Sequence, residues 1–228
     1  AAVAVGVGTG QNNQGNGAVA IGEQAGKYGQ NVRSVTIGYY AGYSAQGDTT
    51  HGSVAIGDHA GSNNQGGDCV AIGTSAGQGS QGIDSVAIGS NAGCNAQGND
   101  AVAIGPKAGK ATQGDESVAI GYSAGSDSQN TGSVAIGYST GQISQGTDSV
   151  AIGKYTGCNL QSDYAVAIGP WAGKSGQQRN AVALGRLAGC NAQGVDAVAI
   201  GYRAGSNLQS TNGVAIGNSA GSNGQSNY

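Results

Sequence analysis

The stretch from Ser133 to Asp148 reads SVAIGYSTGQISQGTD, and the rest of the chain repeats its pattern. With Ile136 as the reference, the frame fits fourteen times, at Val5, Ile21, Ile37, Ile56, Ile72, Ile88, Ile104, Ile120, Ile136, Ile152, Ile168, Leu184, Ile200 and Ile216. The step is 16 residues except between Ile37 and Ile56, where it is 19, so three residues are inserted within 47–52. A short and strict period of this kind indicates a solenoid in which each repeat forms one rung.

The composition is unlike that of an ordinary globular domain. The chain has 46 Gly, 2 Pro and only 9% charged residues, with a formal net charge of −3. Such a composition without a period is typical of disorder, but a disordered chain has no need to keep Val, Ile and Gln in register. We therefore expect a single β-solenoid domain over residues 1–228. Sparse, scattered Lys and Arg argue against nucleic-acid binding, and the lack of any run of 18 apolar residues argues against membrane insertion.

Alternation with a period of two predicts strands at each Val-Ala-Ile segment. We expect Val134 and Ile136 to point inward and Ser133 and Ala135 to point outward. Glycines recur at fixed places, and they predict a bend at residues 137–139, a return strand through Gln145 and a second bend at 146–148. The sequence thus predicts an all-β fold, a parallel β-solenoid (β-roll) of fourteen 16-residue rungs.

The outward columns expected from this orientation contain small residues instead of the Thr, Lys and Glu that usually cover a solvated sheet. A flat strip of methyl and hydroxyl groups suits packing against another copy of the chain. We therefore expect self-association through the column of Ala55, Ala71, Ala87, Ala103, Ala119, Ala135, Ala151 and Ala167. The first and last rungs follow the pattern without a cap, which suits either end-to-end stacking or a piece of a longer protein.

One glutamine follows each reference position by nine residues. Its amide can bond to the next rung and to backbone groups, so we interpret the column as a structural ladder. Its members are Gln14, Gln30, Gln46, Gln65, Gln81, Gln97, Gln113, Gln129, Gln145, Gln161, Gln177, Gln193, Gln209 and Gln225.

Three other sets of residues have side chains that bind metals or react. Asp48, His51, Asp58 and His59 match no known metal-ligand spacing, and a solvated loop is the preferred interpretation. The column of Asp68, Asp84, Asp100 and Glu116, continued at Asp148 and Asp196, suits either turn residues or calcium ligands. Cys94, Cys158 and Cys190 share a column but lie too far apart for a disulfide, and Cys69 is in another column.

No catalytic constellation, phosphate loop or cofactor motif is present, so we expect no enzyme and no cofactor. Tyr39, Tyr122, Tyr138 and Tyr202 share one column, and Tyr40, Tyr155 and Trp171 lie in the next. Aromatic side chains at one bend suit contact with glycans or with neighbouring molecules.

The segments SVAIGYSAG (117–125) and SVAIGSNAG (85–93) resemble the head repeats of YadA-type trimeric autotransporter adhesins. Similar A-I-G-x-x-A-G-x-x-x-Q units are familiar from predicted fibre proteins of phages and large DNA viruses. The resemblance implies a parallel β-roll, a side-by-side trimer and binding to host surfaces. The family's repeat is usually shorter and lacks the fixed glutamine, and the resemblance carries over no ligand.

We expect a structural protein that forms a fibre outside the cell, at the cell surface or at the virion surface. Self-association would be end to end, through the Ala/Ser face, or both. An adhesin head that binds a surface or a glycan is the alternative. An ice-binding protein is a third possibility, although ranked Thr residues are missing from the expected flat face.

Overall fold

The computed structural model describes residues 1–46 and 52–224, without the side chains of residues 45 and 46. The chain divides into two compact units, Ala1–Glu116 and Ser117–Tyr228, and each is described by itself. Both units are all-β. The described residues form no helix, and therefore no helix that could cross a membrane. The expected single domain stays a prediction, and the insertion lies largely outside the described residues.

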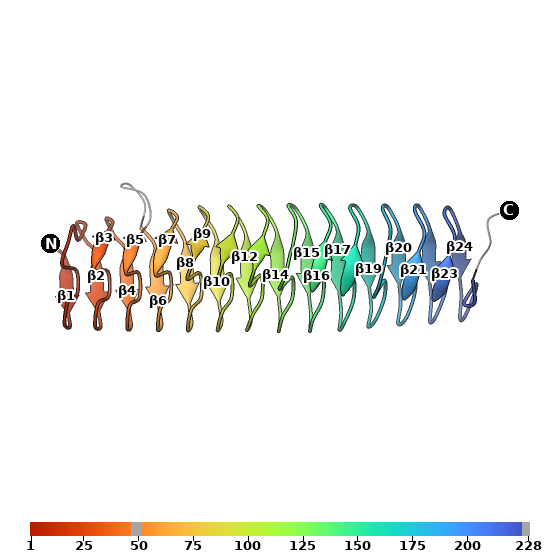
Figure 1. Ribbon diagram of the computed structural model, residues 1–228, viewed down its shortest axis with the longest axis horizontal. Helices are drawn as coiled ribbons and strands as arrows, with labels where there is room; N and C mark the ends of the chain where they lie inside the picture. Colours follow the sequence, from red (N-terminus) through yellow and green to blue (C-terminus); the bar gives the residue numbers. More distant parts are fainter. Residues whose placement is uncertain (47–51, 225–228) are drawn as a thin grey trace. The chain divides into compact units, whose positions relative to one another are not determined.

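Each unit has a first wall made of the Val-Ala-Ile segments (Figure 1). In the first unit these strands are β1 (Val3–Val5), β2 (Val19–Ile21), β4 (Val35–Ile37), β6 (Val54–Ile56), β8 (Val70–Ile72), β10 (Val86–Ile88) and β12 (Val102–Ile104). In the second unit they are β14 (Val118–Ile120), β15 (Val134–Ile136), β17 (Val150–Ile152), β19 (Val166–Ile168), β20 (Val182–Leu184), β22 (Val198–Ile200) and β24 (Val214–Ile216).

The second wall is less regular, and its strands end at the recurring glutamine. In the first unit it contains β3 (Tyr28–Gln30), β5 (Ser44–Gln46), β7 (Asn63–Gln65), β9 (Ser80–Gln81), β11 (Ala96–Gln97) and β13 (Thr112–Gln113). In the second unit it contains two pairs, β16 (Ile143–Gln145) with β18 (Asn159–Gln161), and β21 (Asn191–Gln193) with β23 (Asn207–Gln209).

Neighbouring rungs pair in parallel and in register. Val134 pairs with Val150, Ala135 with Ala151 and Ile136 with Ile152, so each residue meets its equivalent in the next copy. The register therefore stacks equivalent positions into columns. This arrangement confirms the predicted parallel β-solenoid with a spacing of about 16 residues.

The predicted bends are confirmed at both places. Residues 137–141 form the first bend and residues 147–148 the second. Gly137 has φ +137°, and a Cβ there would overlap the carbonyl oxygen of Gly153 in the next rung. A glycine is required because the backbones of successive first bends approach each other too closely for a side chain.

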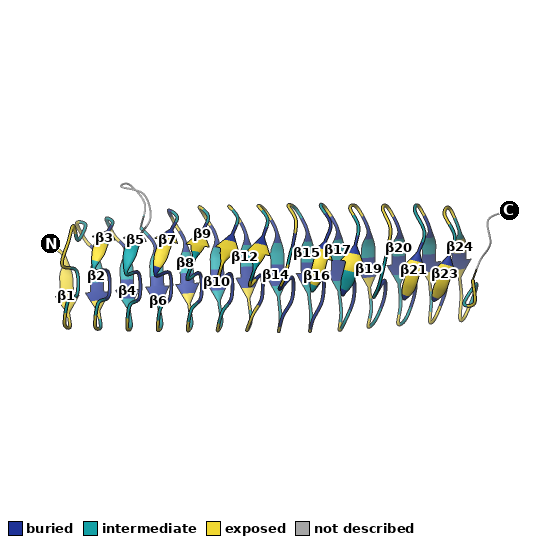
Figure 2. Ribbon diagram, in the orientation of Figure 1, coloured by how far each residue is buried: buried dark blue, intermediate teal, exposed yellow. Residues whose placement is uncertain are grey.

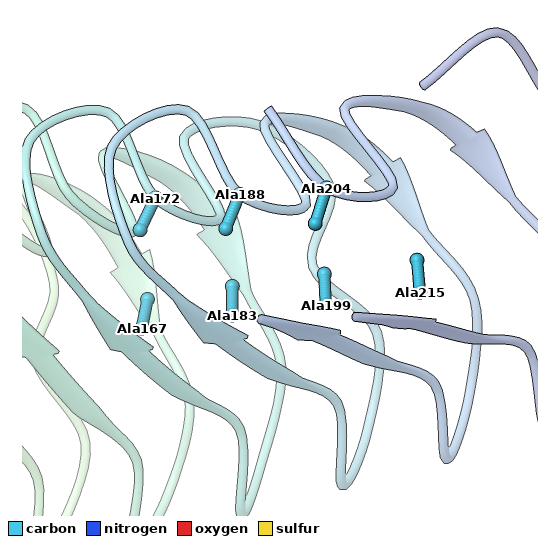
Figure 3. Close-up of a cluster of buried hydrophobic side chains, with 7 residues drawn as sticks. All are labelled: Ala167, Ala172, Ala183, Ala188, Ala199, Ala204 and Ala215. Carbon is cyan, nitrogen blue, oxygen red and sulfur yellow. The ribbon is translucent and has the colours of Figure 1, made fainter. Parts of the chain in front are cut away.

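The prediction of which side faces inward is wrong. The alanines expected to form an outer self-association face are fully buried, with 0% exposure at Ala55, Ala71, Ala87, Ala103, Ala119, Ala135, Ala151 and Ala167. Figure 2 shows buried segments within the first-wall strands β2, β4, β6 and β8. Figure 3 shows Ala167, Ala183 and Ala199 of the first wall opposite Ala172, Ala188 and Ala204, which belong to the first bends. The core is therefore lined by methyl groups, and Val134 and Ile136 point outward.

The narrow interior explains this orientation. The Gln145 side chain crosses it and brings its Nε2 within 2.8 Å of the carbonyl oxygen of Val134 in the first wall. A gap that one glutamine spans has room for alanine but not for Val and Ile. Inner serines also find partners, since Ser133 Oγ donates to the Asn130 carbonyl at 2.6 Å and Ser149 Oγ to the Gly146 carbonyl at 2.7 Å.

Candidate functional site: the Val/Ile face

The outward side of the first wall is a ladder of branched apolar side chains, which we call the Val/Ile face. In the second unit its members are Val118, Ile120, Val134, Ile136, Val150, Ile152, Val166, Ile168, Val182, Leu184, Val198, Ile200, Val214 and Ile216. Ile168 is 40% exposed and Ile200 36%, and the valines between them are partly exposed. No polar side chain interrupts these two columns within the described part of this unit.

The first unit has an equivalent face. It consists of Val3, Val5, Val19, Ile21, Val35, Ile37, Val54, Ile56, Val70, Ile72, Val86, Ile88, Val102 and Ile104. Ile21, Ile72 and Ile104 are 36–39% exposed. The same chemistry thus repeats in both units.

Such a face has a direct physical implication. Parallel sheets are usually covered on both sides, because a side built from Val and Ile is poorly solvated. Here the inner side is covered by the alanine core, and the outer side is open to solvent in the single chain. Contiguous exposed apolar surface of this kind marks sites of protein association.

The glutamine column links the two walls. Every described column member donates from Nε2 to the carbonyl of the valine eleven residues earlier, at 2.7–3.0 Å. Most members also donate to the carbonyl four residues later, as Gln177 does to Ala181 at 2.9 Å. Since that carbonyl precedes the next first-wall strand, one amide connects two successive rungs.

Some described members also bond amide to amide, as between Gln14 and Gln30, Gln65 and Gln81, Gln161 and Gln177, and Gln177 and Gln193, at 3.1–3.3 Å. Backbone carbonyls are the more regular partners. The side chain of Gln46 and the whole of Gln225 lie outside the described residues. The contribution of the column to stability stays a prediction.

The acidic column occupies the second bend. Asp68, Asp84, Asp100 and Glu116 all have φ between +54° and +57°, a conformation that single turn residues adopt. In the described part of the chain, no group of three or more His, Cys, Asp or Glu side chains is placed to hold a metal ion. His59 contacts the carboxylate of Asp58, while Asp48 and His51 lie outside the described residues.

All four cysteines are buried and free. Burial raises the pKa of the Cys94, Cys158 and Cys190 thiols, and a nearby lysine, Lys110 or Lys174, opposes this shift. Two of the thiols contact a glutamine of the preceding rung, with Cys94 Sγ 3.8 Å from Gln78 Oε1 and Cys158 Sγ 3.7 Å from Gln142 Oε1. These thiols are therefore protonated at neutral pH.

The sequence pattern identifies the Val and Ile columns correctly. The prediction that these columns form the core is wrong, because they lie on the outer side of the first wall. A usable signal is present, because the columns at Ser133, Ala135 and Thr140 contain almost only Ala, Ser or Thr in every copy. Uniformly small residues at three columns indicate a space that admits nothing larger.

A comparison with protein families supports the resemblance. The YadA head domain repeat (2 copies) matches residues 80–108, 113–140 and 192–220. No curated protein matches the chain. The three matched segments include both segments whose motifs suggested this family. Over these residues the chain is similar to YadA head repeats, and its parallel β-solenoid fits that similarity.

Proposed function

We propose that the protein is a non-enzymatic component of a cell or virion surface, and that its β-solenoid associates side by side with further copies through the Val/Ile face. The proposal rests on one observation, the outward orientation of both apolar columns. It requires no cofactor, metal or nucleic acid. The Val/Ile face takes the role that the sequence analysis gave to the Ala/Ser face, because the Ala/Ser face is buried inside each chain.

Burial of this face supplies the driving force. Covering a side chain such as Ile168, which is 40% exposed, removes apolar surface worth about 1.5 kcal/mol at the usual coefficient. The columns repeat this contribution at every rung, so the total grows with the number of rungs in contact. The similarity to YadA-type head repeats favours three copies side by side.

A pair of matched variants tests the proposal. Ile168→Lys with Ile200→Lys places two charges on the Val/Ile face, where burial between chains is costly. Leu160→Lys with Leu208→Lys makes the same chemical change on the second wall, where the leucines are 61% and 69% exposed. Sedimentation velocity should show dissociation of the isoleucine variant only, with unchanged circular dichroism for both.

Two results would count against the proposal. One is a wild-type chain that remains a monomer at high concentration. The other is equal dissociation by the leucine variant, because then the Val/Ile face has no special role. End-to-end association is separate, and it predicts species whose length grows with concentration even in the isoleucine variant.

An adhesive role is the second candidate. The observation that favours it is the similarity to head repeats of adhesins. Such a role requires a surface that remains accessible when the Val/Ile face is covered, and a ligand that binds it saturably.

A further inference from the structure

The first bends of the second unit carry a row of aromatic rings in contact with one another. Tyr122 stacks on Tyr138 with ring centroids 5.2 Å apart and an interplanar angle of 13°. Tyr155 contacts Tyr138 edge-on at 5.4 Å and stacks on Trp171 at 6.3 Å. Tyr122, Tyr138 and Tyr202 are 40–44% exposed. These rings form a line across successive rungs.

Exposed cations complete the line. The Arg186 guanidinium lies 5.9 Å from the Trp171 ring and 5.6 Å from the Tyr202 ring, and Arg203 lies 5.9 Å from Tyr202. The Lys154 ammonium is 5.5 Å from both Tyr138 and Tyr155. All three cations are exposed, and we call this row of rings and cations the aromatic–cationic strip.

The strip is electrostatically one-sided. The two bend positions that supply it contain no Asp or Glu in the second unit. The four acids of residues 117–228 lie elsewhere in the rung, at Asp127, Asp148, Asp163 and Asp196. The strip is thus locally positive although the whole chain has a formal net charge of −3.

The orientation of the rings adds to this effect. Rings that stack along the column cover their electron-rich faces with a neighbouring ring or a cation. Their edges, which carry the positive part of the ring quadrupole, are then the groups available to solvent, whereas Tyr138 and Tyr155 share a side-chain hydrogen bond. Ring edges and cations both favour an anionic ligand over a neutral one.

We propose that the aromatic–cationic strip binds an extended acidic polysaccharide whose carboxylates or sulfates contact Lys154, Arg186 and Arg203. Rungs are about 4.8 Å apart, so Lys154 and Arg186 are about 10 Å apart along the column, and Arg203 is about one rung further. A polymer with one uronic acid per disaccharide would carry its carboxylates at about the interval between Lys154 and Arg186, and Arg203 would contact a further anionic group of the same polymer. Nucleic acid is disfavoured because its binding depends on neutralising many phosphates, and the chain has only nine Lys and Arg residues.

The proposal rests on the adhesive role proposed above and concerns a different surface from the Val/Ile face. Its test uses the full chain and reads the fluorescence of Trp171, the single tryptophan, on titration with heparin, hyaluronate and neutral dextran. We expect one or both acidic polymers to change the fluorescence saturably, and the binding to weaken as salt is added. Sulfate recognition predicts heparin alone, whereas carboxylate recognition includes hyaluronate.

Variants identify the contacts. Arg186→Gln with Arg203→Gln should weaken binding about tenfold or more, because two charge-assisted contacts are lost. Arg186→Lys with Arg203→Lys keeps the charge and should recover part of the affinity. Arg179→Gln is the matched control, since Arg179 is also exposed and lies over an aromatic ring, Tyr164, but outside the strip.

Four outcomes would overturn the proposal. They are no binding of either acidic polymer, equal binding of dextran, equal weakening by Arg179→Gln, and equal or tighter binding of double-stranded DNA. None of these depends on self-association, which sedimentation of the same samples measures separately. If the strip binds no acidic polymer while the chain still self-associates, the proposed role of the Val/Ile face therefore stands.

Discussion

The side-chain carbonyl oxygen of Gln145 lies so close to the Cβ position of Gly141 that a side chain there would overlap it. The same relationship links the equivalent pair Gly157 and Gln161, where a Cβ added to the glycine would lie 2.7 Å from Oε1 of the glutamine. Glycine and glutamine four residues apart are therefore one structural device. The glycine leaves room for the amide that joins the two walls.

Gly141→Ala should destabilise the protein by more than the cost of its backbone angle. Gly141 has φ +51°, and an alanine in that region costs about 1–2 kcal/mol before any clash. Gly176→Ala is the control, because Gly176 has φ +68° and the nearest atom to its Cβ position is 3.7 Å away. Thermal unfolding should show the larger loss for Gly141→Ala, and equal losses would refute the steric coupling to Gln145.

Gln145→Ala should lower the free energy of unfolding by about 2–4 kcal/mol. The substitution leaves the carbonyls of Val134 and Ser149 without their shared amide donor in a buried setting. Gln178→Ala, at an exposed glutamine next to the column, should change stability little. Chemical denaturation of both variants measures the difference. An unchanged unfolding midpoint for Gln145→Ala would mean that the column contributes nothing to stability.

Neighbouring substitutions on one strand test the inside-out orientation. Ala135→Leu forces three carbons into a core that admits methyl groups and should prevent or strongly impair folding. Val134→Thr exchanges a partly exposed side chain for one of similar shape and should cost less than about 1 kcal/mol in the single chain. Circular dichroism with thermal unfolding compares the two. If Ala135→Leu were tolerated and Val134→Thr strongly destabilised the chain, Ala135 would point outward and Val134 inward, which would contradict the orientation described above.

Stability should decrease in alkaline solution because of the buried thiols. Burial raises the pKa of Cys94, Cys158 and Cys190 above the ordinary value of 9.0, so the unfolded chain loses these protons first. The native state is thus favoured below pH 9, and this contribution is lost as the pH rises through the native pKa. Replacing the three cysteines with alanine should flatten the stability profile above pH 9. An identical profile in that variant would show that other groups cause the loss.

Most of the fold is predictable from the sequence, because a strict period fixes the rung and recurring glycines fix its bends. The side of the first wall that faces the interior is not predictable in this way. Alternation shows that Val134 and Ile136 share one side and Ala135 the other, and it says nothing about which side is enclosed. The distance between the walls decides this, and it depends on how Gln145 spans the interior. Because the sequence does not give this distance, the self-association face was expected at Ala135 instead of at its neighbours Val134 and Ile136.

The aromatic contacts are predictable only in part. The shared columns of Tyr122 and Tyr138 and of Tyr155 and Trp171 follow from the period. The position of Arg186 between Trp171 and Tyr202 depends on side-chain orientations at the bend, which the spacing does not determine.

The molar mass of the wild-type chain in solution, measured by sedimentation velocity over a wide concentration range, tests the claim that the Val/Ile face joins copies of the chain. Association through the Val/Ile face predicts a discrete multiple of the single-chain mass that persists on dilution. A single-chain mass at every concentration would contradict the claim.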